Sequence, residues 1–197
     1  MMRRGVVAAL ALLLLGAGDY PPPRTMRQTG AAQWFGNVIL TDQDGRRVRL
    51  YEDLMAGQVV VVNAFYTGCR AACPQAMGTL AHLQAQLAID GVSARFISIT
   101  VDPEHDTPDR LSLYARALEG GTLEGGAGWR MLGGDPASVR QALHKFGLDT
   151  DPDDPGDHLN VLYMGNLRTG LWEKVFSLAP LDDLEQLLRQ VEADRGE

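Results

Sequence analysis

The sequence predicts an α/β fold in which a mixed sheet carries helices on both faces. The uninterrupted apolar run at residues 59–65, VVVVNAF, is typical of a strand that is buried on both sides. Residues 94–101 alternate between polar and apolar, as a second strand does. Each of these strands precedes a stretch with apolar residues at helical spacing. A length of 197 residues with 45% hydrophobic residues suits one globular domain plus a leader.

The first 36 residues differ in composition from the rest of the chain. MMRR is followed by an uncharged apolar run, Gly5 to Gly18, which predicts a signal peptide or a short N-terminal membrane anchor over residues 1–18. The run is shorter than the roughly 20 apolar residues of a usual membrane span. We interpret the polar, Pro-rich residues 19–36 as a tether and residues 37–197 as the domain. This arrangement predicts an exported, periplasmic protein that is soluble or tethered to the inner membrane by its N-terminus.

The charge balance of the body is acidic. Without the two arginines of the leader, 16 Lys and Arg residues stand against 25 Asp and Glu residues, a net charge of −9. Nucleic-acid binding needs a basic surface, so the balance argues against it. Basic proteins or cations fit this charge better.

The first half of the domain contains a hairpin and two strand–helix units. Residues 38–50 predict a β-hairpin around the turn DQDG. After strand 59–65, a helix is predicted to begin at Pro74, because proline suits the first helical position. After strand 94–101, the next helix begins at Pro108.

The second half adds one inserted unit and a closing β-β-α unit. Glycines from Gly120 to Gly128 mark a loop, residues 129–132 form a short strand, and a helix runs from Pro136 to a stop at Gly147. Strands at 159–164 and 171–176 and a last helix from Pro180 follow. Without the inserted β-α unit, this is the element order of a thioredoxin-like fold.

The only two cysteines, Cys69 and Cys73, lie between the apolar strand and Pro74. The free N–H groups and positive dipole end at a helix start favour a thiolate and lower its pKa from about 8.5 to roughly 3.5–7.5. A purely structural disulfide across so short a loop would constrain the unfolded chain little. The carboxyl end of a central strand is also where α/β folds place their sites. We therefore interpret the pair as functional, either as a reversible disulfide or as two metal ligands.

The spacing C-x-x-x-C is wider than the C-x-x-C of thioredoxin-type enzymes, and two thiolates leave a metal site incomplete. The histidines are the candidates for a third ligand. His82 and His144 lie within predicted helices, where a polar residue on a solvated face is the simpler interpretation. His158 opens a strand whose preceding loop would face the cysteines, and it is the first candidate. His105, in the loop after strand 94–101, is the second.

Two thiolates and one imidazole form a soft set of low coordination number. Such a set suits Cu(I), and it suits Cu(II) with a fourth ligand. Zinc accepts the same atoms but usually has four protein ligands in structural sites, so copper is favoured and zinc stays open.

The acidic segments beside the histidines have simpler interpretations than metal binding. In DPEHDTP, residues 102–108, we expect Asp102-Pro103 to form a turn and either Asp106 or Thr107 to cap the helix, because aspartate is a poor ligand for Cu(I). The five aspartates between 149 and 157 suit a solvated loop. Their charge would raise the pKa of His158, and Asp157 would orient its ring.

Three motifs together resemble the Sco/SenC family of copper-binding proteins. They are C-x-x-x-C-P at residues 69–74, DPEHDTP and Asp157-His158, and the resemblance covers the chain from about Asn37 onward. It implies a thioredoxin-like fold and copper held by Cys69, Cys73 and His158. It also implies delivery of copper to the CuA centre of cytochrome c oxidase, or reduction of that centre's cysteines. The expected partners are the oxidase subunit carrying CuA, a thiol reductant and another copper carrier, with the chain itself a monomer.

The resemblance favours a metallochaperone over an enzyme, but two enzymatic alternatives use the same residues. In a thiol–disulfide oxidoreductase, Cys69 would attack a substrate disulfide and Cys73 would resolve it. Redox enzymes that share this fold resemble one another in having a cis-proline just before the strand that faces the cysteines. This chain has His158 at that place. A thiol peroxidase would need a threonine and an arginine around one cysteine, and Thr67 and Arg70 are the nearest.

Overall fold

A computed structural model describes residues 26–70, 72–119, 128–149 and 160–196. Its centre is one seven-stranded mixed sheet with the strand order β2-β1-β5-β4-β3-β6-β7. The strands are β1 Ile39–Asp42, β2 Arg47–Arg49, β3 Val59–Phe65, β4 Arg95–Thr100, β5 Arg130–Gly133, β6 Val161–Asn166 and β7 Leu171–Phe176. The helices are α1 Met26–Phe35, the short π-type helix η1 Leu50–Met55, α2 Ala72–Ile89, α3 Pro108–Glu119, α4 Pro136–Lys145 and α5 Leu181–Ala193.

Strand β3 is central to the sheet, as its apolar sequence predicts. All seven of its residues are buried. It runs parallel to β4, from Val60 opposite Arg95 to Phe65 opposite Thr100, and antiparallel to β6. The carboxyl ends of β3 and β4 therefore meet at one edge of the sheet, and the segment with the cysteines leaves from that edge.

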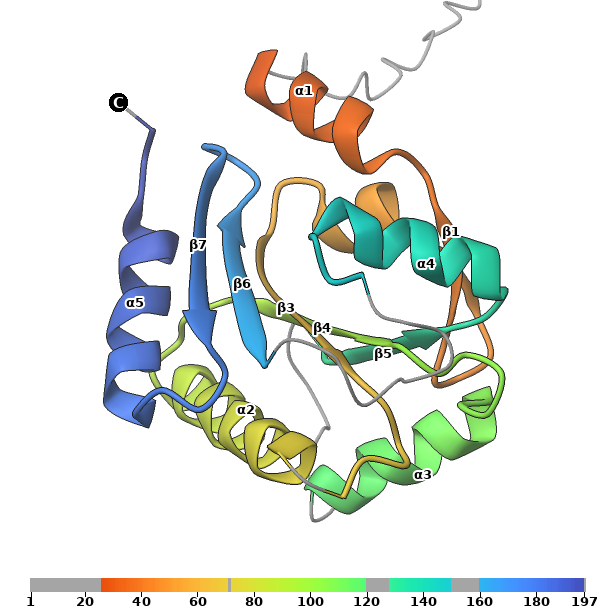
Figure 1. The fold of residues 1–197 in the computed structure, drawn as a ribbon. Coiled ribbons are helices and arrows are strands. Elements are labelled where there is room, and N and C mark those ends of the chain that lie inside the picture. Colours follow the sequence, from red (N-terminus) through yellow and green to blue (C-terminus); the bar gives the residue numbers. More distant parts are fainter. Residues whose placement is uncertain (1–25, 71, 120–127, 150–159, 197) are drawn as a thin grey trace, which may run out of the picture.

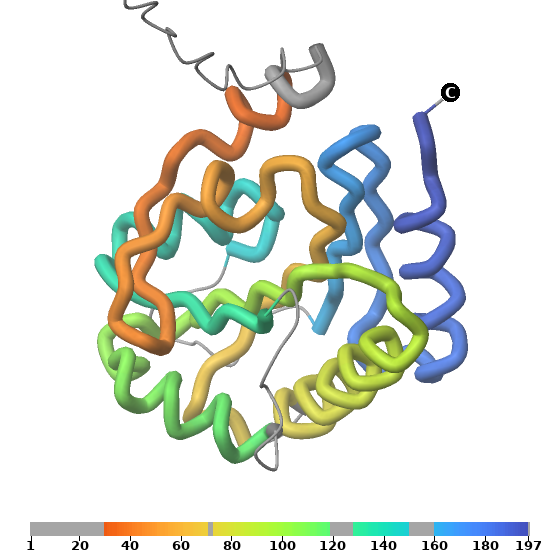
Figure 2. Tube along the Cα trace, turned by 180° about the vertical axis from the view of Figure 1, so that it is seen from behind, coloured from red at the N-terminus to blue at the C-terminus, as the bar shows by residue number. Residues whose placement is uncertain are grey.

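Each face of the sheet has its own apolar layer (Figures 1 and 2). Helices α2, α3 and α5 cover one face, where Met77, Leu111 and Leu184 are fully buried. Helices α1, η1 and α4 cover the other, and Leu50 and Leu143 are buried there. The predicted arrangement, a sheet between two helical layers, is confirmed.

The predicted hairpin and the inserted unit are both present. Strands β1 and β2 pair around the turn DQDG, and β5 lies between β1 and β4. In the inserted helix α4, the Asp135 carboxylate caps the first turn by accepting from the Ser138 N–H at 2.9 Å. The helix is stopped at Gly147, whose φ of 62° lies in the left-handed region that glycine adopts without strain.

Helix α2 begins at Ala72, two residues before the predicted start at Pro74. Proline is acceptable as the third residue, since the first four N–H groups of a helix have no partner within it. The consequence for the site is that Cys73 belongs to the first turn of the helix.

Two elements were not predicted. Helix α1 lies inside the polar segment interpreted as a tether, and among its residues 30–35, whose burial the structure describes, only Phe35 is buried, so the segment has no apolar period there. The helix is anchored by Phe35, which packs against Phe146 and Trp172 at ring-centroid distances of 5.1 and 5.6 Å. The helix η1 follows β2 where the sequence reads as the end of a strand. The division at residues 18 and 36 remains a prediction.

Several predicted segments lie outside the described residues, among them the leader at 1–18, residues 120–127 of the glycine loop and the aspartate-rich residues 150–157. Within the described ranges, no helix has both the length and the apolar character that a membrane crossing requires.

Candidate dithiol and metal site

The two cysteines are brought together where β3 gives way to α2. Their Cα atoms are 5.9 Å apart, and the two sulfurs are joined as a disulfide. Cys73 is only 2% exposed, whereas Cys69 is half-buried in the turn that precedes the helix. Cys69 is therefore the more accessible residue of the pair, which suits attack on a substrate or exchange of a ligand.

The turn before the helix is held to the end of β3 by backbone hydrogen bonds. The N–H of Cys69 donates to the carbonyl of Tyr66 at 3.3 Å. One strand away, the N–H of Val101 donates to the carbonyl of Phe65 at 2.8 Å. These contacts fix both ends of the short segment that leads from β3 to Cys69.

A buried carboxylate, Asp106, completes this arrangement. It accepts hydrogen bonds from the Thr67 N–H at 3.0 Å, from the Thr67 hydroxyl and from the Thr100 hydroxyl. The neighbouring Tyr114 packs on Phe65, with ring centroids 5.6 Å apart. Burial raises the pKa of Tyr114, and the negative charge of Asp106 adds to the increase.

This geometry decides between the two predicted helix caps. The Thr107 hydroxyl accepts from the Arg110 N–H at 3.4 Å, so Thr107 occupies the capping position of α3. Asp106 is directed instead at the cysteine-bearing loop, a role that sequence reasoning missed. The available signal was three polar residues that follow two adjacent parallel strands: Thr67 just after β3, Thr100 at the end of β4, and Asp106 in the loop after it.

The structure describes three of the four histidines. His82 is exposed on α2, and His144 of α4 is exposed and contacts Asp149 at 3.0 Å, as their interpretation as solvated residues expects. His105 follows β4 at the cysteine edge of the sheet, and its Nδ1 lies 2.7 Å from Oδ1 of Asp102. The hydrogen bond with Asp102, together with the charge of that residue, raises the pKa of His105.

His158, the first candidate for the third ligand, and Asp157 lie outside the described residues. Among the residues that the structure describes, no three histidine, cysteine or acidic side chains come together as a metal site. The structure thus brings together Cys69 and Cys73, and the assignment of His158 stays a prediction.

The contacts of Thr67 argue against the peroxidase alternative, which needs a threonine hydroxyl beside the reactive cysteine. The Thr67 hydroxyl donates its hydrogen to Asp106, so that hydrogen is not free to stabilise a thiolate or a peroxide.

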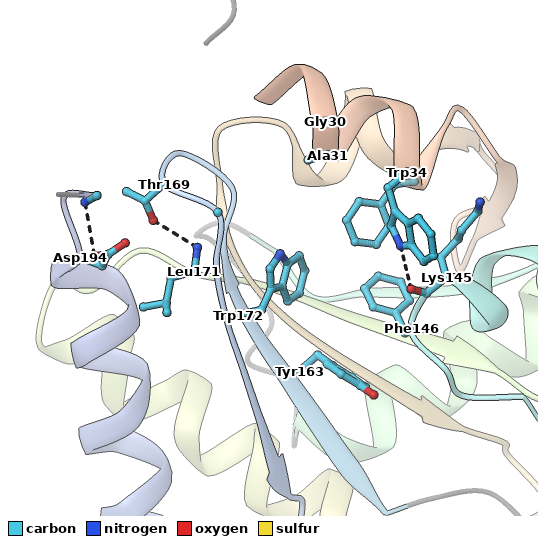
Figure 3. A pocket seen from close by; sticks show the side chains of 13 residues that line it. Gly30, Ala31, Trp34, Lys145, Phe146, Tyr163, Thr169, Leu171, Trp172 and Asp194 are labelled. Atoms are coloured by element: carbon cyan, nitrogen blue, oxygen red, sulfur yellow. Dashed lines mark hydrogen bonds between the residues drawn. The ribbon is translucent and has the colours of Figure 1, made fainter. Parts of the chain in front are cut away.

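A cavity of about 770 Å³ lies elsewhere, between α1, the end of α4 and the β6–β7 hairpin (Figure 3). The residues that line it include the aromatic side chains of Trp34, Phe146, Tyr163 and Trp172. It is built on the face of the sheet that carries α1 and α4, whereas the cysteines start the helix on the opposite face. The cavity is therefore separate from the cysteine pair.

The fold and the cysteine pair define a thioredoxin-like α/β protein with a C-x-x-x-C site at the start of a helix. The family model described as SCO1/SenC matches residues 26–166. The chain belongs to the SCO1/SenC family.

Known relatives agree with this membership. A SCO1 protein homolog of Bacillus subtilis is 34% identical over 74 residues, a match that spans 38% of this chain and 37% of the relative. The solved structure of BsSco, described as a member of the Sco family of cytochrome c oxidase assembly proteins with a disulfide switch, is 25% identical. It has a TM-score of 0.64 and covers 78% of this chain and 90% of its own. Copper-bound ScoI of Bradyrhizobium japonicum is also 25% identical, with a TM-score of 0.56 and coverage of 78% and 96%.

Proposed function

We propose that this protein is a copper chaperone that binds one copper ion through Cys69, Cys73 and His158 and delivers it to the CuA site of cytochrome c oxidase. The observation that carries the proposal is the pair of sulfurs held together at the edge of the sheet in a member of the SCO1/SenC family. The copper-bound ScoI structure and the description of BsSco as an oxidase assembly protein support the choice of metal and of partner.

The donor set fits copper as a cargo. Thiolates are soft ligands that select Cu(I), and an imidazole also suits copper. A site with few ligands, one of them a half-buried sulfur, can pass its ion on by exchanging ligands one at a time with a receiving protein. A closed cage of four protein ligands, as in structural zinc sites, would retain it.

Loading requires the dithiol form of the protein. A thiol reductant gives two electrons and two protons to the Cys69–Cys73 bond and leaves as its own disulfide. Binding of copper to the cysteines then releases their protons, so affinity falls as the pH is lowered. The disulfide that the structure holds would be the unloaded, oxidised form in such a cycle.

The experiment is a copper titration of the reduced protein against a chromophoric Cu(I) chelator. We expect one ion per chain and at least about tenfold weaker binding, or about 1.4 kcal/mol, for Cys69→Ser, Cys73→Ser and His158→Ala. His82→Ala is the matched control, because His82 is an exposed histidine on a helix and should leave the affinity unchanged. Binding of Cu(II) should add a thiolate-to-copper charge-transfer band.

The histidine variants separate the two candidate ligands. Wild-type affinity in His158→Ala would contradict the assignment of His158. A loss confined to His105→Ala would move the third ligand to the β4–α3 loop.

A second function, thiol–disulfide oxidoreductase, is favoured by the disulfide itself. In this reaction the reduced protein would hand two electrons to the oxidised cysteines of the CuA site and return to its own disulfide. We expect His158→Ala to abolish copper transfer to a purified CuA domain. If the same variant reduces the disulfide of that domain at the wild-type rate, the reductase is the working function.

A further inference from the structure

The carboxylate of Asp106 is buried, and its hydrogen bonds connect the segment after β3 with the end of β4. Asp106 is 1% exposed, and Thr100, one of its partners, is fully buried. Three donors reach its two oxygens: the N–H and hydroxyl of Thr67 and the hydroxyl of Thr100. A buried group with this many partners fixes the chain segments that supply them, because leaving any of them unpaired is costly.

The segments fixed in this way are the cysteine-bearing turn and the end of β4. Thr67 stands two residues before Cys69, within the turn closed by the hydrogen bond from Cys69 to Tyr66. Thr100 is the last residue of β4, and its hydroxyl also accepts from the Asp102 N–H at 3.0 Å. Asp106 itself is placed by its N–H, which donates to the Asp102 carbonyl at 2.9 Å. The chain of contacts runs from the loop after β4 to the turn before Cys69.

Opening the disulfide removes one of the constraints that keep the two sulfurs near each other. Cys73 remains fixed, because it is buried in the first turn of α2. Cys69 then depends on whatever holds its turn, and the contacts of Asp106 with Thr67 do not involve either sulfur. A turn held in this way keeps the two thiols preorganised for closure or for a shared ion.

We propose that Asp106 is a positioning residue that keeps Cys69 close to Cys73 when the two sulfurs are not bonded to each other. The proposal rests on the proposed function only in requiring that the cysteines act as a pair in the dithiol form. A carboxylate suits the position, since its two oxygens accept all three hydrogen bonds and its charge strengthens each of them.

The experiment measures the equilibrium between the disulfide and the dithiol of the full chain in glutathione buffers, without metal. In Asp106→Asn the negative charge is lost and only one of the two polar atoms still accepts, so the charge-assisted hydrogen bonds from Thr67 and Thr100 are weakened. The turn loosens, the effective concentration of one thiol near the other falls, and the disulfide becomes at least tenfold easier to reduce. This change corresponds to a potential about 30 mV less negative.

Asp42→Asn is the matched control. Asp42 is also 1% exposed and also holds a turn, by accepting from the N–H groups of Asp44 and Arg46 at 3.0 and 2.8 Å. That turn belongs to the β1–β2 hairpin, which β5 and β4 separate from β3, the strand that leads to the cysteines. We expect this variant to lose stability and to keep the wild-type disulfide equilibrium. An equal shift in Asp42→Asn and Asp106→Asn would overturn the proposal, and so would no shift in Asp106→Asn.

A second pair of variants covers the case in which Asp106→Asn does not fold. Thr67→Val removes the hydroxyl donor with little change of shape, and Thr67→Ser retains it. The proposal expects easier reduction in the valine variant and rescue in the serine variant, and identical equilibria in the two would overturn it. Copper binding is scored separately: a wild-type protein that binds no copper, but whose disulfide responds to these changes, refutes the proposed function and leaves the role of Asp106 standing.

Discussion

Two adjacent residues, His105 and Asp106, have opposite environments. The His105 side chain is 70% exposed and contacts Asp102, whereas Asp106 is buried against the cysteine turn. The sequence DPEHDTP predicts the turn and the capped helix, and the cap at Thr107 is confirmed. It does not distinguish the capping residue from the buried one. That difference depends on which residue of β3 lies opposite Thr100, and this register is a tertiary property.

The cysteine pair itself could be predicted from the sequence because every signal was local. The buried strand, the two cysteines and the helix start lie within residues 59–74, and their order alone places the pair. The third ligand could not be derived in the same way. Its position depends on a loop more than eighty residues further along the chain, and only the analogy to a thioredoxin-like fold puts that loop beside the cysteines.

At the residue scale we predict a raised pKa for His105, measured from its ring-proton shift in an NMR titration. The hydrogen bond to Asp102 is the main cause, the charges of Asp102 and Glu104 add to it, and Arg110 and slight burial oppose it. Asp102→Asn should lower the midpoint. A pKa that is higher in the folded state stabilises the fold at low pH, and this contribution disappears as the pH rises through the folded pKa. The same midpoint in both proteins would show that the Asp102 contact does not persist in solution.

At the scale of elements, β6 has a glycine, Gly165, at the position where the Trp172 side chain of β7 leaves no room for a Cβ. Gly165 pairs directly with Trp172, and a Cβ on Gly165 would lie 2.5 Å from Cζ3 of the indole. The indole is in turn packed against Phe35 and Phe146, at ring-centroid distances of 5.6 and 6.1 Å. The ring thus cannot move without disturbing the layer that α1 and α4 form.

We therefore predict that Gly165→Ala destabilises the protein by about 1–3 kcal/mol, the usual cost of overpacking, measured as the urea midpoint. Gly78→Ala is the control, because a Cβ there meets nothing within 4 Å and Gly78 lies inside helix α2. That change should stabilise by up to about 1 kcal/mol. Shifts of the same sign in the two variants would contradict the close approach of Trp172.

Most elements could be predicted because their apolar residues recur at strand or helix spacing along the chain itself. β3, β4 and α4 agree with their predicted ranges to within a residue or two. Helix α1 could not be predicted, because the aromatic partners of its buried Phe35 are Phe146 and Trp172, more than a hundred residues away. The signal for α1 therefore lies in the aromatic residues that it contacts.

At the scale of the whole molecule, the apolar layer on the α1 side extends beyond the predicted domain start at residue 37. Phe35 is 5% exposed in that layer, and the indole N–H of Trp34 donates to the Lys145 carbonyl at 3.1 Å. Figure 3 shows Trp34 beside Lys145 and Phe146 at one side of the aromatic cavity. Trp34 and Phe35, at the end of the segment interpreted as a tether, therefore contact the α4 side of this layer.

We predict that Phe35→Ala lowers the free energy of unfolding by about 3–5 kcal/mol, as for other buried aromatic residues. Trp34→Ala should lower the free energy of unfolding much less, because Trp34 is 57% exposed. The difference is measurable by urea unfolding of the two variants. A chain beginning at Asn37 should behave like Phe35→Ala, and a truncated chain as stable as one beginning at Met26 would show that α1 is dispensable.

The distances along the chain between paired residues also bear on the order of events during folding. Strand β1 pairs with β5 through Thr41 and Gly133, roughly ninety positions apart, whereas the cysteines are separated by 4. Pairings between remote segments form slowly, and short loops close fast. An oxidant can thus join Cys69 to Cys73 before the sheet is complete, so an oxidised pair is no proof that a molecule has reached its native state.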